Sequence, residues 1–105
     1  MTKSRIETLK GFIANRPSDP FPRYGLAQEY KNAGLLAEAR DEFVALMTAH
    51  PDYTAAYLHA GNVHLALGER AEARAVYERG IAACLRRGDS HAKGELEGAL
   101  STLGE

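Results

Sequence analysis

Apolar residues recur along the chain with the spacing of amphipathic helices. The first group, Ile6, Leu9, Phe12 and Ile13, lies on one side of a 3.6-residue period and predicts a helix over 4–15. Alternation with a period of two, which is typical of strands, is absent, and Ala, Leu, Glu and Arg dominate the composition. The pattern therefore predicts an all-α protein.

Capping residues and glycines divide the rest of the chain into five more helices. Asp19 predicts an N-cap with Pro20 at the first helical position, and Gly34, Gly68 and Gly88 suit the left-handed residue that ends a helix. Connections of a few residues make neighbouring helices antiparallel. The predicted helices span about 20–33, 36–49, 53–68 with Asp52 as its cap, 70–86, and 90–103 with Asp89 or Ser90 as its cap.

The helical pattern repeats with a fixed period. Residues 37–40 read Ala-Glu-Ala-Arg, and the same four residues return 34 positions later at 71–74. The register also pairs Gly34 with Gly68, Phe43 with Tyr77, and Pro17 with Pro51. Such a period indicates one supersecondary unit copied along the chain, with each copy burying its apolar face on its neighbour.

The two copies share a spacing of small and aromatic residues, which is typical of a known helical repeat. The first copy reads Arg23-x2-Leu26-Ala27-x2-Tyr30, then Ala39-x3-Phe43, then Pro51. The second reads Tyr57-x2-Ala60-Gly61-x2-His64, then Ala73-x3-Tyr77, with Leu85 where a proline would be expected. This pattern resembles the tetratricopeptide repeat, W-x2-L-G-x2-Y, A-x3-F, P. Arg23, Ala60 and His64 depart from it.

The resemblance implies a short right-handed α-solenoid of antiparallel helix hairpins with about six helices. A single domain is expected over 1–105, with full repeats at about 20–53 and 54–87 and single flanking helices at about 4–16 and 90–103. Because Leu85 replaces the proline, the long helix is expected to continue to Gly88. The predicted core comprises Leu9, Phe12, Ile13, Leu26, Ala27, Tyr30, Ala39, Phe43, Leu46, Met47, Ala60, Gly61, Ala73, Tyr77, Ile81 and Leu85.

The resemblance also implies a concave groove along the first helix of each hairpin. Gln28 and Asn62 are equivalent under the 34-residue shift, and paired carboxamides both donate to and accept from a peptide backbone. The alternative reading is that these polar residues are merely solvated. The expected groove contacts are Tyr24, Gln28, Lys31, Asn32, Leu58, Asn62 and Leu65.

Charge limits the classes of binding partner, and cysteine content bears on the cellular compartment. The chain has 13 basic and 14 acidic residues, a formal net charge of −1, which argues against nucleic acid and against a polybasic membrane anchor. Cys84 is the single cysteine, so no internal disulfide forms, which fits a reducing, cytoplasmic compartment. No signal peptide is visible, and no run of about 18 apolar residues predicts a membrane span.

The residues that could carry chemistry favour structural roles. His59 and His64 are five apart, which places them on different helix faces, and His64 stands at a core aromatic position. No base or orienting group accompanies Cys84, and no P-loop, dinucleotide fingerprint, nucleophile elbow or HExxH pattern occurs. Glu38, Glu42, Glu69 and Glu72 are expected on a solvated outer face. We therefore expect no catalysis, no cofactor and no metal.

Two functions remain after these exclusions. The first is a small interaction module or scaffold that binds a peptide segment or helix of a partner protein in the groove. The chaperone-tail clamp of some tetratricopeptide domains is not expected, because Tyr24 and Leu58 stand where lysines would be needed. The alternative is a self-associating unit, for example a homodimer, that uses an exposed terminal helix.

Overall fold

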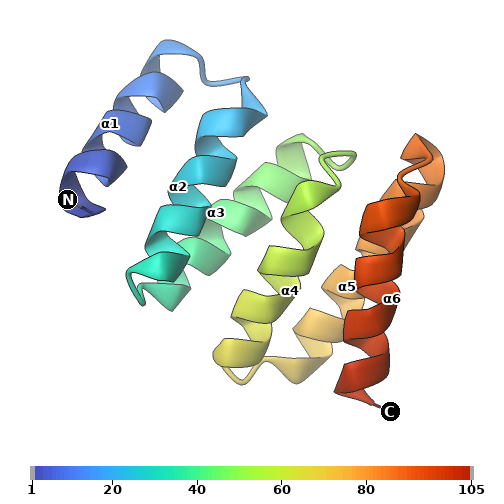
Figure 1. The fold of residues 1–105 in the computed structure, drawn as a ribbon. Coiled ribbons are helices and arrows are strands. Elements are labelled where there is room, and N and C mark those ends of the chain that lie inside the picture. The colour runs from blue at the N-terminus through green and yellow to red at the C-terminus, as the bar shows by residue number, and fades with distance from the viewer. Residues whose placement is uncertain (1, 105) are drawn as a thin grey trace.

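The computed structural model describes residues 2–104, with side chains described from Arg5 onward. Within this range the chain forms six α-helices and no strand (Figure 1). The all-α prediction is therefore confirmed. The helices are α1 (Thr2–Asn15), α2 (Pro20–Asn32), α3 (Leu36–Ala49), α4 (Ala55–Ala66), α5 (Arg70–Arg87) and α6 (Ser90–Leu103).

The helices form a row of antiparallel hairpins. The closest packing joins α2 to α3, α4 to α5 and α5 to α6, while α1 packs on α2 alone. Figure 1 shows the row running from α1 at one end to α6 at the other, with α4 and α6 side by side in front of α5. This arrangement is the predicted short α-solenoid, in which each hairpin packs on its neighbours.

Most helix ends follow the predicted capping residues. The Asp19 side chain accepts a hydrogen bond from the Phe21 amide at 3.1 Å, and Asp89 accepts one from the Ala92 amide at 3.1 Å. Gly34, Gly68 and Gly88 have φ between 70° and 80°, the left-handed conformation that favours glycine. The last of them ends α5 after Arg87, as the loss of the proline predicted.

The predicted N-cap of α4 is wrong. The helix begins at Ala55 with Thr54 as its N-cap residue. The carboxylate of Asp52 instead pairs with the guanidinium of Arg86 on α5, with 2.7 Å between Arg86 Nη2 and Asp52 Oδ1. An opposite charge on the neighbouring helix thus competes successfully with the capping role.

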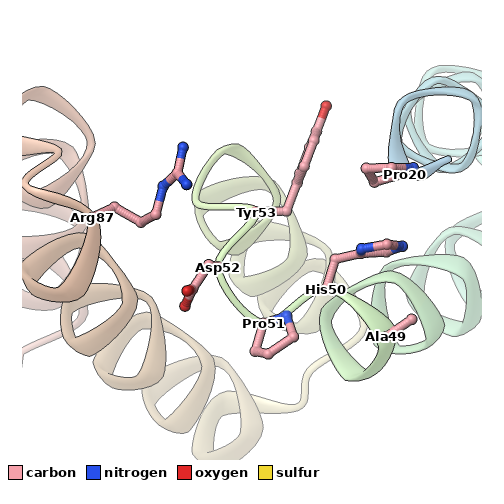
Figure 2. A pocket seen from close by; sticks show the side chains of 7 residues that line it. All are labelled: Pro20, Ala49, His50, Pro51, Asp52, Tyr53 and Arg87. Atoms are coloured by element: carbon pink, nitrogen blue, oxygen red, sulfur yellow. The ribbon is translucent and has the colours of Figure 1, made fainter. Parts of the chain in front are cut away.

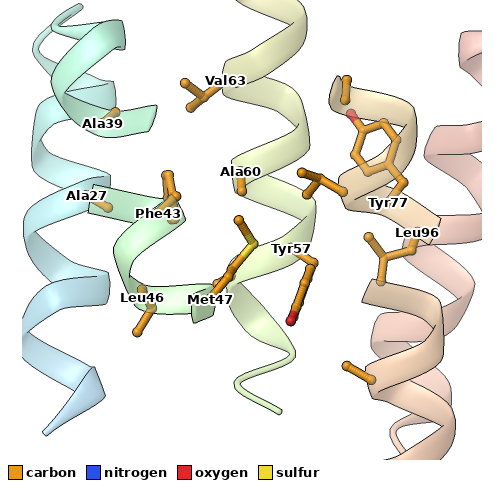
Figure 3. Close-up of a cluster of buried hydrophobic side chains, with 14 of the residues drawn as sticks. Ala27, Ala39, Phe43, Leu46, Met47, Tyr57, Ala60, Val63, Tyr77 and Leu96 are labelled. Carbon is orange, nitrogen blue, oxygen red and sulfur yellow. The ribbon is translucent and has the colours of Figure 1, made fainter. Parts of the chain in front are cut away.

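The core lies between the hairpins (Figure 3). Phe43, Leu46 and Tyr77 are fully buried there, as predicted. A β-carbon added at Gly80 would lie 2.6 Å from Tyr57 Cβ and 2.8 Å from Leu96 Cδ1, and one added at Gly61 would overlap the Tyr77 ring. The small residue expected at Gly61 is therefore required by close helix packing.

Two predicted core residues are wrong. Phe12 is 54% exposed and Leu85 is 65% exposed. Phe12 lies on α1, which has only α2 as a neighbour, so part of its apolar stripe has no helix to pack on. In the lengthened α5, Ala83 and Cys84 face inward, and the rotation of about 100° per residue turns Leu85 outward.

Several residues that the structure buries were not in the core predicted from the repeat. Tyr57 of α4 packs on Gly80 of α5, and Val76 is buried on α5. Val63 points from α4 toward Ala39 and Phe43 of α3 (Figure 3). Leu96 and Leu103 are the buried residues of α6. None of the helices within residues 2–104 combines the length and the apolar character that crossing a membrane requires.

A polar group links the hairpins at the end of α4. The Nδ1 atom of His64, which is 6% exposed, lies 2.7 Å from Glu69 Oε1, and Arg40 Nη1 donates to Glu69 Oε2 at 2.7 Å. The packed, hydrogen-bonded imidazole at His64 was expected, but Glu69 is not simply solvated. The hydrogen bond from His64 and the ion pair with Arg40 lower the pKa of the Glu69 carboxyl.

Candidate functional site

Three of the expected groove residues meet at one hollow between α4 and α6. Leu58, Asn62 and Leu65 project from α4, and Tyr77 of α5 lies at the base between the two helices. The hollow has a volume of about 460 Å³ and is open to solvent. We call it the α4–α6 hollow.

The opposite wall of the α4–α6 hollow comes from α6 and was not predicted. Glu95, Gly98, Ala99 and Thr102 line it, and Arg70 of α5 closes one end. A β-carbon added at Gly98 would meet no atom within 4 Å, so the space beside this residue is open.

The 34-residue period does not predict the α6 residues of this wall, because the repeat register changes before α6. A shift of 34 from Leu58 and Asn62 reaches Ala92 and Leu96, which pack into the core. The slip has a simple cause, since α5 contains 18 residues where its counterpart α3 contains 14. The available sequence signal was weak: the glycine at position 98 interrupts a helical pattern, and Gly94 does so in the same helix.

The two equivalent carboxamides have different surroundings. Asn62 Oδ1 accepts a hydrogen bond from the Tyr77 hydroxyl at 2.5 Å. In the first copy Phe43 stands in place of Tyr77 and has no hydroxyl, and the buried Oε1 of Gln28 has no partner among the described residues. The copies therefore differ in whether the amide oxygen has a hydrogen-bond partner.

Tyr24 and Lys31 gather around a histidine that was not among the expected groove residues. The Tyr24 ring lies 5.4 Å from the Tyr53 ring and 6.0 Å from the His59 ring, centroid to centroid. Lys31 Nζ lies 3.4 Å from His59 Nδ1. Burial and then the charge of Lys31 lower the pKa of His59, which favours its neutral form as an acceptor of the lysine proton.

Glu95 connects this cluster to the α4–α6 hollow. Its charge acts on both Tyr24 and His59, opposing the lowering of the His59 pKa and adding to the burial that raises the Tyr24 pKa. We call the surface that carries the cluster and the hollow the inner face. Its residues are Tyr24, Lys31, Leu58, His59, Asn62, Leu65, Glu95 and Gly98.

Asn32 is separate from these groups. It is the last residue of α2, its side chain is exposed, and no hydrogen bond joins it to another described side chain. It does not line the α4–α6 hollow. Asn32 and Gln28 are the two expected contacts that belong to neither the cluster nor the hollow, and whether any of the seven residues binds a partner stays a prediction.

A second hollow of about 370 Å³ lies at the helix ends (Figure 2). His50, Tyr53 and Arg87 are among its lining residues, and Figure 2 shows the Arg87 and Tyr53 side chains projecting from neighbouring segments. The Asp52 carboxylate in its wall is already paired with Arg86. The carbonyl ends of α3 and α5 also lie here, and their partial negative charge disfavours an anion.

Candidate catalytic and metal-binding residues do not assemble within residues 2–104. No three His, Cys, Asp or Glu side chains there are grouped so that they could hold a metal ion. Cys84 is buried, and burial raises the pKa of its thiol, which disfavours the reactive thiolate. The arrangement offers hydrogen bonds, aromatic rings and apolar surface for binding.

Comparison with known proteins agrees with this architecture. No family model matches the chain. It is 30% identical over 98 residues to the TPR repeat-containing protein PA0015 of Pseudomonas aeruginosa, and the match covers 93% of each protein.

Solved structures extend the agreement to the fold. The solution structure of a tetratricopeptide repeat domain protein from Salinibacter ruber is 32% identical, with a TM-score of 0.79 over 84% of this chain and 89% of that one. PcrH, in complex with the chaperone binding region of PopD, is 14% identical, with a TM-score of 0.88 over 97% of this chain and 77% of that one. From its relatives, its repeated pattern and its stacked hairpins, the chain belongs to the tetratricopeptide repeat family.

Proposed function

We propose that this chain is a non-catalytic interaction module that binds a segment of a partner protein on its inner face. The observation that carries the proposal is the α4–α6 hollow, which combines the apolar side chains of Leu58 and Leu65 with the amide of Asn62. Apolar surface supplies affinity, and a few placed polar groups orient what is bound.

The cluster around Tyr24 and His59 is a second reason to propose binding on the inner face. Tyr24 and Tyr53 present partly exposed rings, and Lys31 and His59 add hydrogen-bonding groups beside them. Aromatic rings with a polar edge are enriched where proteins bind one another. The fold neighbour PcrH, whose structure holds a region of PopD, gives a precedent for a protein segment bound by this fold.

The proposal is tested by selection followed by mapping. The full chain is immobilised and a randomised library of short peptides is selected on it, and each recovered peptide is titrated into the labelled protein while amide NMR shifts are recorded. We expect the largest shifts at Leu58, Asn62 and Leu65. Shifts confined to the outer surface of α3 and α5 would refute binding on the inner face.

Self-association is a second candidate, favoured by a specific exposed surface. Phe12 is 54% exposed and Phe21 is 70% exposed, and Phe12 lines a hollow of about 360 Å³ with Pro22 and Arg16. Exposed apolar surface of this kind often marks an interface.

Light scattering over a wide concentration range tests this candidate. Association through α1 predicts a mass that rises with concentration and returns to the monomer value in Phe12→Ser. A monomer at every concentration would eliminate self-association. Leu85→Ser is the matched control, because Leu85 is similarly exposed but lies on α5.

A further inference from the structure

The α4–α6 hollow is apolar at its base and large enough for a side chain. Leu58 and Leu65 line one side and Ala99 the other. A cavity of about 150 Å³ with apolar walls is sufficient to hold benzene. At about 460 Å³, the hollow has room for a large side chain together with part of the backbone that carries it.

Gly98 lines the hollow and adds no side chain to it. No atom lies within 4 Å of the position that a β-carbon would take, so a larger residue would fit the helix without displacing its neighbours. A glycine inside an exposed helix costs about 1 kcal/mol relative to alanine. The open space is therefore maintained at the expense of helix stability.

The two ends of the hollow carry opposite charges. Glu95 is half exposed, and its closest ionic neighbour among the described residues is His91 Nε2, at 3.6 Å. At the other end Arg70 donates to the carbonyl of Leu103 and has no carboxylate partner within residues 2–104. No lysine or arginine neutralises Glu95 there, so the acidic end is available to a cation.

Asn62 supplies a hydrogen-bond donor at the rim. Because its Oδ1 accepts from the Tyr77 hydroxyl, the amide orientation is fixed with Nδ2 free. The side chain is exposed, so Nδ2 is accessible to an acceptor such as a main-chain carbonyl.

We propose that the α4–α6 hollow receives one large apolar side chain of a bound peptide segment, and that the same segment places a basic side chain beside Glu95. This inference rests on the proposed function and specifies the partner's chemistry. A main-chain carbonyl of the segment accepts from Asn62 Nδ2, and the positive end at Arg70 favours an acidic or neutral residue on the far side. The opposite charges thus fix the direction in which the segment lies.

The first test fills the hollow without unfolding the protein. Gly98→Leu places a side chain in the open space, and Gly11→Leu is the matched control, since Gly11 is also helical with no atom near its β-carbon position but lies on α1. Both changes are expected to raise the melting temperature. A library-selected peptide should bind about tenfold or more weakly to Gly98→Leu and equally well to Gly11→Leu.

The second test addresses the charge. Glu95→Gln should weaken the same peptide by about threefold to tenfold, and the difference should shrink as salt is added. Glu97→Gln is the control on the same helix, because Glu97 already pairs with Lys93 at 2.8 Å. A peptide variant with its apolar anchor changed to alanine should lose binding to the wild-type protein and to Glu95→Gln alike.

The outcomes separate the inference from the proposed function. If a peptide binds Gly98→Leu with unchanged affinity and still shifts the amide NMR signals of inner-face residues, the inference is overturned and the proposed function stands. Peptides that shift only α3 and α5 would overturn both. If the selection recovers none, N-acetyl-leucinamide and N-acetyl-argininamide serve as probes by NMR, and the absence of any shift at Gly98 with the first and at Glu95 with the second would overturn the inference.

Discussion

At the scale of single residues, one hydroxyl group distinguishes the side chains at two equivalent core positions of the repeat. Tyr77 and Phe43 occupy equivalent positions and are both fully buried. Of the two, only Tyr77 has a hydroxyl, which donates a hydrogen bond to the side-chain amide of Asn62 on the inner face. One hydrogen bond thus connects the packing between α4 and α5 to the rim of the α4–α6 hollow.

We expect Tyr77→Phe to lower the free energy of unfolding by about 1 kcal/mol. The ring and its packing are retained, and the exposed amide of Asn62 recovers part of the loss by binding water. Denaturant unfolding monitored by circular dichroism measures the change. In an Asn62→Ala background the same substitution should cost little, and an equal cost in both backgrounds would show that the hydroxyl bond contributes nothing.

Individual core residues were predictable where both copies share them. Ala39 and Ala73, like Phe43 and Tyr77, occupy equivalent buried positions, because each unit packs in the same way. Phe12 was not predictable, since periodicity gives the apolar face of a helix without showing whether another helix covers it. Gly98 and Glu95 were missed because they follow the lengthened α5, where the period no longer applies.

At the scale of elements, α6 is held at both ends by the preceding helices. At its start, Asp89 Oδ1 accepts from the Ala92 amide and Oδ2 accepts from the Thr54 hydroxyl at 2.7 Å. At its end, Arg70 and Arg74 of α5 donate to the carbonyls of Leu103 and Gly104. Gly94 and Gly98 weaken the helix locally, so these contacts and the burial of Leu96 hold it in place.

The stability provided by Asp89 should depend on pH in a defined direction. The hydroxyl of Thr54 and the amide of Ala92 lower the pKa of its carboxyl in the folded protein below the unfolded value. The contribution is therefore complete above the unfolded pKa and is lost as the pH falls through the lowered folded pKa. Asp89→Asn should be less stable than wild type at neutral pH, and the two should converge in acid.

Thermal unfolding of both proteins across the acid range measures this effect. Asp52→Asn is a suitable control, because Asp52 is an aspartate that pairs with Arg86 instead of capping a helix. A difference in melting temperature between Asp89→Asn and wild type that stays constant at every pH would contradict the pH linkage. It would show that the effect does not depend on the charge of Asp89.

Helix ends show what the sequence determines at this scale. Asp19, Asp89 and the glycines after α2, α4 and α5 act as predicted, because each capping interaction is local. Asp52 does not, since its partner Arg86 is 34 residues away and could not be recognised from local spacing. Local chemistry was therefore predictable, and competition from distant charges was not.

At the scale of the whole molecule, the solenoid measures 39 × 29 × 19 Å and depends on contacts between successive hairpins. The group formed by Arg40, His64 and Glu69 is the polar link between α3 and the α4–α5 turn. Solenoid stability is approximately the sum of each repeat and its interfaces. The boundaries of the repeats at about 20–53 and 54–87 stay a prediction.

We expect Arg40 and Glu69 to be coupled in a double-mutant cycle. Arg40→Ala and Glu69→Gln should each lower stability, and the double mutant should lose less than the sum of the two, because the same ion pair is removed once. Chemical denaturation of the four proteins measures the coupling. Arg40→Ala paired with Glu72→Gln is the control cycle, and coupling as large in that cycle would show that the ion pair is not specific.

The hydroxyl bond between Tyr77 and Asn62 also has a practical consequence for observation. The chain contains five tyrosines and no tryptophan, so no indole masks the phenol signal in the near ultraviolet. A molecule that engages Asn62 alters the acceptor of the Tyr77 proton and hence the absorption and emission of that ring. The protein therefore carries its own chromophore beneath the rim, bonded to Asn62, and occupancy is readable from unlabelled material, with Tyr77→Phe as the spectroscopic blank.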